Sequence, residues 1–296
     1  MTRTLIIIAL TVLWRLNASP VLYAADEGIL LTEEIQLKLA DSFMDEHEYY
    51  RAVTELKKFI ILFPSSSRTD TVLFKLGTAY YHGDEFEPAI KAFSSVTARY
   101  PQSNYSPQAG YYIGLCEWRL NRLDEALTDF MLVASRYPTS PDAPQSLQSA
   151  SMVAFDQKDI VKSREIMGQL QASYPERRDA AKTEKALALL DDKQLLPRKS
   201  PAVAALLSAL IPGAGHIYAG HYGDGMTSFF LNGLFIAGTV IAAQQENYAV
   251  AGVIGGIGLP FYLGNIYGAA NAATKWNITI RKELRGEISV LLNSPF

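Results

Sequence analysis

The sequence predicts an all-α protein, in which a solenoid of helical hairpins is followed by a small transmembrane helical bundle. A proline recurs every 37 residues, each time directly after an aromatic residue, and such regularity is typical of stacked copies of one supersecondary unit. The four prolines are Pro64, Pro101, Pro138 and Pro175. From residue 201 onward, apolar stretches replace the repeats, with almost no charge before Lys275. The mean hydropathy of +0.05 agrees with a chain that is part soluble and part membrane-bound.

Small and large residues stand at fixed places inside each repeat. The second repeat has Gly77, Ala89 and Phe93, and the corresponding residues of the first and third are Ala40, Ala52, Leu56 and Gly114, Ala126, Phe130. Two antiparallel helices approach closely only where no large side chain intervenes, and the large residue fills the space beyond that contact. Each proline then ends the second helix, because proline lacks an N–H and disfavours helical geometry in the preceding residue. We therefore expect four helical hairpins over residues 30–176, the fourth being degenerate.

The pattern Leu76-Gly77-x-x-Tyr80, Ala89-x-x-x-Phe93, Pro101 resembles the tetratricopeptide signature. The period is three residues longer than is usual in that family, and the surplus lies in connectors rich in Ser, Pro and Asn. The sequence Tyr-Pro-x-Ser resembles repeats of bacterial envelope proteins, of the outer-membrane assembly lipoprotein and cell-envelope constriction coordinator type. The resemblance implies a scaffold that binds proteins or peptides.

Residues 1–25 have the pattern of an export signal. Arg3 precedes an apolar run, and the small pair Ala24-Ala25 follows it. Because a large residue stands where a small one is preferred for cleavage, an uncleaved N-terminal anchor is the alternative. Either reading places the repeats outside the cytoplasm. We expect a protein of the inner membrane, with its repeats in the periplasm.

Residues 177–197 predict a capping helix and a linker. Leu187, Leu190 and Leu195 have the spacing to pack on the last repeat, while the charged residues among them face water. Such a helix gives the end of a solenoid its polar outer side. The run from Pro197 to Pro201 then marks the domain boundary.

Residues 198–275 predict a membrane module of about three helices, followed by a basic tail at residues 276–296. The apolar stretches are 202–218, 226–243 and 248–270, each near the length that crosses a bilayer. Two or three crossings are both open, and the basic tail favours three, with the C-terminus in the cytoplasm. Two pairs of glycines at small-xxx-small spacing predict close helix packing: Gly252 with Gly256, and Gly264 with Gly268.

The first of these stretches contains a glycine-rich turn. The motif Pro212-Gly213-x-Gly215-x-x-Tyr218-x-Gly220 resembles the turn of two-pass membrane modules of the TM2-like type. The resemblance implies a membrane-embedded helical module and carries no catalytic role.

The first helix of each repeat predicts the partner-binding groove, since in tetratricopeptide proteins this helix lines the concave side. Its inward positions are unusually aromatic for a surface, and exposed aromatic patches usually mean interaction. The candidate groove residues are Phe74, Tyr81, Tyr111, Leu115, Trp118, Met152 and Phe155. The alternative is that these side chains pack against the neighbouring repeat. The expected partner is an envelope protein or peptide.

Several function classes lack support in the sequence. A net charge of −3 without a long basic run argues against nucleic acid. There is no phosphate-binding loop, serine nucleophile elbow or His-Glu-x-x-His motif, so we expect no enzyme, cofactor or metal. The turn histidines His216 and His221 do not have a recognisable ligand spacing, and Cys116 is expected to be a small buried hydrophobe.

Two other functions stay open as alternatives. A transport or channel component would place the activity in the membrane bundle, whose polar residues are Asn232, Thr239, Asn265 and Asn271. A cell-wall-associated binding protein would stack sugars on the aromatic residues of the groove.

Overall fold

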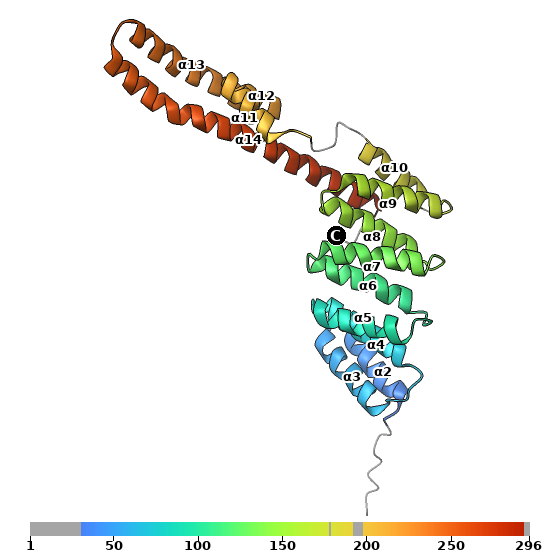
Figure 1. Ribbon diagram of the computed structural model, residues 1–296. Helices are drawn as coiled ribbons and strands as arrows, with labels where there is room; N and C mark the ends of the chain where they lie inside the picture. The colour runs from blue at the N-terminus through green and yellow to red at the C-terminus, as the bar shows by residue number, and fades with distance from the viewer. Residues whose placement is uncertain (1–30, 178, 192–197, 293–296) are drawn as a thin grey trace, which may run out of the picture. The chain divides into compact units, whose positions relative to one another are not determined.

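The computed structural model describes residues 31–177, 179–191 and 198–292, which form helices and short turns (Figure 1). The chain divides into two compact units, residues 1–65 and 66–296. The first unit contains α2 (Glu33–Asp45) and α3 (Tyr49–Leu62). The second contains α4 (Thr69–His82), α5 (Phe86–Arg99), α6 (Ser106–Arg119), α7 (Leu123–Arg136), α8 (Asp142–Asp156), α9 (Ile160–Ser173), α10 (Ala180–Asp191), α11 (Pro201–Leu210), α12 (Ala214–Ala219), α13 (Tyr222–Gln244) and α14 (Tyr248–Leu292).

The first unit is one helical hairpin, and it contains the first repeat. Thr32 caps α2 by accepting a hydrogen bond from the backbone N–H of Ile35. The predicted small-to-large packing is present, because Ala52 and Leu56 of α3 are fully buried. Gln36 of α2 donates from Nε2 to a carboxylate oxygen of Glu55 on α3 at 2.8 Å, which joins the two helices.

The repeats of the second unit follow the predicted period. The helices α5, α7 and α9 begin 37 residues apart, and each ends two residues before its proline, as predicted. The glycines of the first helices allow the expected close approach. A Cβ at Gly77 would lie 2.6 Å from the Phe93 ring, and one at Gly114 would lie 2.7 Å from the Phe130 ring. The phenylalanine of each second helix therefore packs directly on the glycine of the first.

The turn inside each hairpin places one residue in the left-handed region. These residues are His47, Asp84, Asn121 and Lys158, which also stand 37 positions apart. Asp and Asn tolerate this conformation because their short polar side chains hydrogen-bond locally. The turn is thus the same in all four hairpins, including the degenerate fourth.

In the third and fourth repeats, the tyrosine before the proline ties its repeat to the one before. The hydroxyl of Tyr174 donates to the backbone carbonyl of Pro138 at 2.8 Å, and Tyr137 makes the same contact to Pro101 at 3.5 Å. This contact gives a physical reason for the recurring Tyr-Pro pair. A phenylalanine precedes the first proline, and it cannot donate such a bond.

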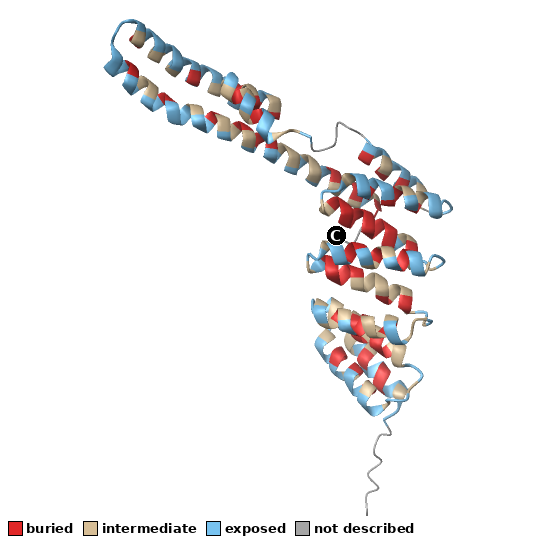
Figure 2. Cartoon of the chain, viewed as in Figure 1, coloured by how far each residue is buried: buried red, intermediate tan, exposed pale blue. Residues whose placement is uncertain are grey.

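The helix after the repeats, α10, is shorter than the range predicted for the capping helix and linker. It packs against α9, with Leu190 buried and Leu187 half-buried on the main core cluster. Figure 2 shows buried residues, in red, on α10 and on the neighbouring repeat helices. The third predicted contact residue, Leu195, lies outside the described residues. The cap thus brings Leu187 and Leu190 onto the last repeat.

The last helix differs from the predicted organisation. α14 runs without interruption from Tyr248 to Leu292, so the expected boundary between membrane module and basic tail at residues 275 and 276 falls inside one helix. Its first part packs against α11, α12 and α13, and its last turns pack against α8 and α10. Residues far beyond the apolar stretch are therefore part of the repeat core.

Candidate partner-binding surface

The predicted groove residues divide into a buried and a half-buried group. Four of the seven are less than 9% exposed: Leu115 and Trp118 on α6, and Met152 and Phe155 on α8. They form the core and offer no free surface, which corrects the expectation that they line an open groove. The physical reason is that helices from both sides enclose them, including the last turns of α14.

The half-buried group consists of Phe74, Tyr81 and Tyr111, and we refer to these three as the aromatic face. Each contacts the ring of Tyr112 on α6 in an edge-to-face arrangement, at centroid distances of 6.0, 5.1 and 6.2 Å. The aromatic face thus combines the two roles that the sequence left open, since it packs between repeats and keeps part of its surface exposed.

Burial also fixes the protonation state of the two tyrosines in this group. It raises the pKa of Tyr81 to about 12 and raises the pKa of Tyr111 in the same direction. The hydroxyl of Tyr111 lies 3.4 Å from Oγ of Ser149 on α8. Both phenols stay neutral at physiological pH and can donate or accept hydrogen bonds at the edge of the aromatic face.

The corresponding face of α8 is covered by the chain itself. We refer to residues 278–292 of α14 as the C-terminal segment. Its Leu284, Ile288 and Leu292 are spaced by four residues, are at most 4% exposed, and join the core cluster that contains Met152 and Phe155. Residues four and eight apart lie on the same side of a helix. One stripe of the segment therefore packs on the repeats.

Polar contacts at both ends of the interface fix the direction of the segment. Asp156 accepts from Nε and Nη2 of Arg285 at 2.5 and 3.0 Å, and from Nε1 of Trp118 at 3.0 Å. Gln148 donates from Nε2 to the backbone carbonyl of Leu292 at 2.6 Å. Leu292, late in α14, pairs with Gln148, whereas the earlier Arg285 pairs with the later Asp156, so the two helices run antiparallel. The ion pair also raises the pKa of the Arg285 guanidinium.

The sequence prediction did not identify Gln148, Asp156 or Arg285. The signal was present in the apolar spacing of Leu284, Ile288 and Leu292, which is that of a core-facing helix. The basic residues of the same segment led instead to a prediction of a cytoplasmic tail. The pairing of one of them, Arg285, with a carboxylate 129 positions earlier depends on tertiary structure.

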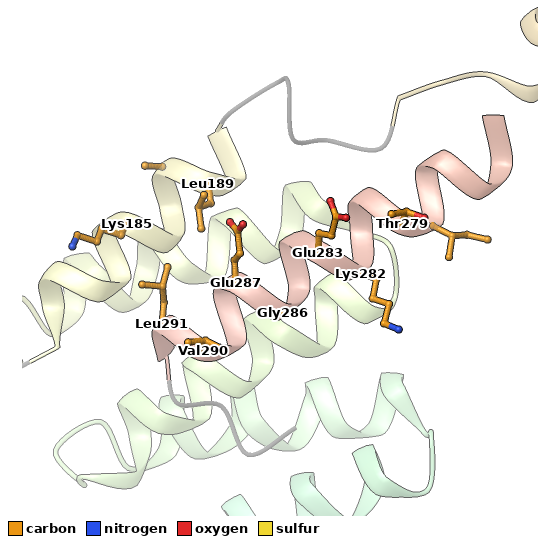
Figure 3. Close-up of a pocket in the computed structure, with 11 residues that line it drawn as sticks. Lys185, Leu189, Thr279, Lys282, Glu283, Gly286, Glu287, Val290 and Leu291 are labelled. Carbon is orange, nitrogen blue, oxygen red and sulfur yellow. The ribbon is translucent and has the colours of Figure 1, made fainter. Parts of the chain in front are cut away.

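An open groove lies between the exposed sides of the C-terminal segment and α10, beside the region where the two helices are in contact (Figure 3). Its volume is about 1130 Å³, and Ala188, Leu189, Ile278, Val290 and Leu291 supply its apolar surface. Lys185 lies on the α10 side, and Lys282, Glu283 and Glu287 lie on the segment. The residues of the segment that line this groove are thus less covered than Leu284, Ile288 and Leu292, which pack on both α8 and α10.

The glycine-rich turn is held by one asparagine. Asn265 of α14 accepts from the backbone N–H of Gly213 at 3.0 Å and donates to the carbonyl of Ser208 at 3.1 Å. Gly213 has φ of +87°, and a Cβ there would lie 2.0 Å from the carbonyl oxygen of Gly225. The motif thus serves a tight turn that packs against α13.

Two other polar residues of the apolar helices also have structural contacts. Thr239 donates to the carbonyl of Phe235, and Asn232 donates to that of Ser228, each within one turn of α13.

The predicted glycine pairs behave differently from the expectation. Among the four, only Gly268 meets a neighbour within 4 Å, namely His216, and the close approach of α13 and α14 uses Gly258 instead.

Two helices in the described part of the chain are long and apolar enough to cross a membrane, α13 and α14. α11 is apolar but has only 10 residues. The described residues contain no group of three or more His, Cys, Asp or Glu side chains that could hold a metal ion. His216 is buried in α12, whereas His221 lies at the surface beside Asp224.

The lone cysteine behaves as predicted. Cys116 is fully buried, and burial raises the pKa of its thiol to about 12. At neutral pH the group is therefore a protonated, small apolar side chain without nucleophilic character.

The family model of the tetratricopeptide repeat matches residues 71–103 and 108–140. These are tetratricopeptide repeats. The two matches cover the hairpins that carry the aromatic face, and the equivalent turns at His47 and Lys158 extend the same geometry to the hairpins on either side. No curated protein matches the sequence.

Several solved structures are similar to this chain at low sequence identity. A tetratricopeptide repeat protein from Parabacteroides merdae is 15% identical, with a TM-score of 0.45, and the match covers 86% of this chain and 98% of that one. A Podosopora anserina putative kinesin light chain with TPR-like repeats is 14% identical, with a TM-score of 0.43 and coverage of 53% and 84%. The Rap conjugation gene regulator of plasmid pLS20, in complex with a Phr peptide, is 14% identical, with a TM-score of 0.39 and coverage of 87% and 79%.

Proposed function

We propose that this chain is a membrane-bound scaffold of the bacterial cell envelope, whose tetratricopeptide array holds a partner protein or peptide at the periplasmic face of the inner membrane. The observation that carries the proposal is the aromatic face. Phe74, Tyr81 and Tyr111 lie on the first helices of consecutive tetratricopeptide repeats and keep part of their surface exposed. Tetratricopeptide repeats commonly bind peptides or proteins, and aromatic side chains supply large contact area at low entropic cost.

The apolar hairpin supports the membrane tether. Large hydrophobic side chains are exposed along both α13 and α14, for example Phe230, Leu234 and Val253 at 62–70%. Exposing so many apolar side chains to water is unfavourable, whereas exposing them to the lipid chains of a bilayer is not. The buried polar contacts of Asn265 hold α14 against α11 and the turn that follows α11.

The contacts of the C-terminal segment favour two crossings. An odd number of crossings would separate Arg285 from Asp156 by a bilayer, yet these side chains form an ion pair. With two crossings, the repeats and the C-terminal segment share one side, and the turn between α13 and α14 lies on the other. The preference for three crossings that followed from the basic tail is therefore replaced.

Two features of the sequence favour opposite sides for the repeats. The export-type leader places them in the periplasm, which is the side we propose. The basic residues Arg198, Lys199 and Lys275, at the repeat end of the hairpin, follow the positive-inside tendency only if that end is cytoplasmic. A labelling experiment separates the two.

Single cysteines in a Cys116→Ser background measure the topology. Glu125→Cys and Lys282→Cys report on the repeats and the C-terminal segment, and Gln245→Cys reports on the far turn. With a membrane-impermeant maleimide on spheroplasts, the first two are expected to react and the third only after lysis. The reverse pattern would place the repeats in the cytoplasm, and reaction of only one of the first two would exclude two crossings.

Partner capture tests the aromatic face directly. Full-length protein in detergent is immobilised, and the proteins that it retains from envelope extract are quantified for the wild type and for Tyr81→Ala. The matched control is Tyr50→Ala, which removes a tyrosine that is 79% exposed on α3. Selective loss with Tyr81→Ala is expected. Equal retention by all three proteins would remove the aromatic face from the proposal.

A further inference from the structure

We propose that the α8 face bearing Gln148 and Asp156 is a helix-binding site, that the C-terminal segment is its resident ligand, and that a partner's amphipathic helix can replace this segment. The replacing helix carries apolar residues at positions i, i+4 and i+8 and an arginine at i+1. This inference rests on the proposed function, because it assumes that the array binds partners. Beyond that function, the inference names a second binding surface, the kind of helix that this surface selects, and the C-terminal segment as the element that blocks it in the free protein.

The apolar contacts define the spacing that the site accepts. Leu284, Ile288 and Leu292 occupy positions i, i+4 and i+8 and are buried to 3%, 1% and 4% exposure. They reach the core cluster that holds Met152 and Phe155 of α8 and Ala186 and Leu190 of α10. An apolar stripe of this period is the usual pattern by which an amphipathic helix docks in a groove. The site is therefore matched to a helix and not to an extended peptide.

Charge complementarity adds a requirement for arginine. The side chain of Asp156 is 19% exposed and accepts two hydrogen bonds from Arg285, while Trp118 supplies a third donor. If the segment left without replacement, a largely buried carboxylate would keep only the Trp118 donor, and such a group is costly. A guanidinium satisfies both oxygens at once, which a lysine cannot do with the same geometry.

Three features weaken the hold on the resident segment. Part of its surface, at Val290 and Leu291, lines the open groove beside α10 and is not fully covered (Figure 3). Nε of Arg281 is buried without a hydrogen-bond partner, although water would satisfy it in the released segment. Gly286 lies in the middle of the helix, where glycine is unfavourable, and a Cβ there would meet nothing within 4 Å. A free helix without these defects can compete with the segment.

The resident segment has one advantage over any competitor, which is its covalent tether. A tethered ligand acts at an effective concentration that reaches the millimolar range for short flexible linkers. Competition is therefore expected to be weak in the wild type and strong once the tethered segment cannot dock.

The test uses full-length protein in detergent and a fluorescent peptide of residues 278–292 with Gly286→Ala, followed by fluorescence anisotropy. In the protein, Ile288→Asp places a charge at a residue that is 1% exposed, and the matched control Val290→Asp places the same charge at one that is 77% exposed. The peptide should bind Ile288→Asp at least about tenfold more tightly than the wild type or the control, since the tethered competitor is gone. Adding Asp156→Ala should weaken that binding by about tenfold, and a peptide with Arg285→Glu should not bind.

Equal affinity for the wild type and Ile288→Asp, or no loss on adding Asp156→Ala, would overturn the inference. Hydrogen exchange of both proteins checks the fold. The C-terminal segment should lose protection in Ile288→Asp, while α4 to α7 keep theirs. If α4 to α7 also lose protection, Arg285→Glu in the protein takes the place of Ile288→Asp, with the same expected gain in affinity.

The two proposals fail separately. If capture depends on Tyr81 but the peptide does not bind, only the helix-binding site on α8 is refuted. If the peptide binds but capture is the same with Tyr81→Ala, the helix-binding site stands and the aromatic face does not.

Discussion

Replacing Gly114 by alanine tests the packing on which the repeat geometry depends. By helix propensity alone, the substitution on α6 should stabilise the protein by about 1 kcal/mol. The structure predicts the opposite sign. The new methyl group would lie 2.7 and 2.8 Å from Cε1 and Cδ1 of Phe130, well inside van der Waals contact.

The Phe130 ring has little freedom to move away. It is fully buried, and the rings of Tyr111 and Trp118 lie 5.5 and 6.3 Å from it, centroid to centroid. Overpacking of a filled core costs about 1–3 kcal/mol, and the upper part of that range applies where the neighbour is confined. After subtraction of the helix propensity, we expect Gly114→Ala to destabilise the third repeat by about 1–2 kcal/mol.

Hydrogen–deuterium exchange by mass spectrometry on the full chain in detergent measures the local effect. Peptides from α6 and α7 should exchange about 5–30 times faster in Gly114→Ala than in the wild type. The control is Gly168→Ala in α9, where a Cβ meets nothing within 4 Å, so that exchange there should slow. Combining Gly114→Ala with Phe130→Leu should cost less than the sum of the two single changes. Unchanged or slower exchange in Gly114→Ala would refute the close-packing argument.

Burial raises the pKa of the Asp129 carboxyl from 3.8 to about 6, and the charge of Glu117 acts in the same direction. The contribution of Asp129 to stability is therefore greatest below pH 3.8 and is lost as the pH rises through 6. Asp129→Asn should therefore raise the free energy of unfolding by about 1–2 kcal/mol at pH 8 and change it little at pH 4, as measured by urea denaturation. Trp118→Ala should destabilise the repeats by about 3–5 kcal/mol, because this side chain is core and not free surface, and a normal melting temperature would contradict that role. Tyr174→Phe should cost about 0.5–1.5 kcal/mol through loss of its hydrogen bond, detected as faster exchange at the end of α9. Asn265→Leu should lower the melting temperature of the detergent-solubilised chain, since it leaves two buried backbone groups of the turn unpaired, and an unchanged melting temperature would argue against that assignment.

The repeat architecture could be predicted from the sequence because its signals are local and repeated. Pro101 and Pro138 end their helices as expected, and Gly77 packs on Phe93 as the small-to-large pattern requires. A single position carries little information, but the same position in four successive units carries much more. The degenerate fourth repeat followed from the period alone.

The groove and the C-terminal segment could be predicted only in part. Helical periodicity identifies which side of α8 Met152 occupies, yet it does not say which element covers that side. That side is covered by Leu284 and Ile288, which follow Met152 by more than 130 positions. The apolar stretch that lies between these residues and the repeats suggested that a membrane separates the two. The basic residues of the segment favoured a tail on the other side of the bilayer, and the carboxylate that pairs with Arg285 is evident only in three dimensions.

The tyrosine-to-proline hydrogen bonds link the connectors of the second, third and fourth repeats. Tyr137 donates to the carbonyl of Pro101, and Tyr174 donates to that of Pro138. An insertion or a deletion in one of these connectors would change the chain length that the bond spans. We therefore expect connector length to affect how the second, third and fourth repeats stack, even though the connectors contribute little to the core.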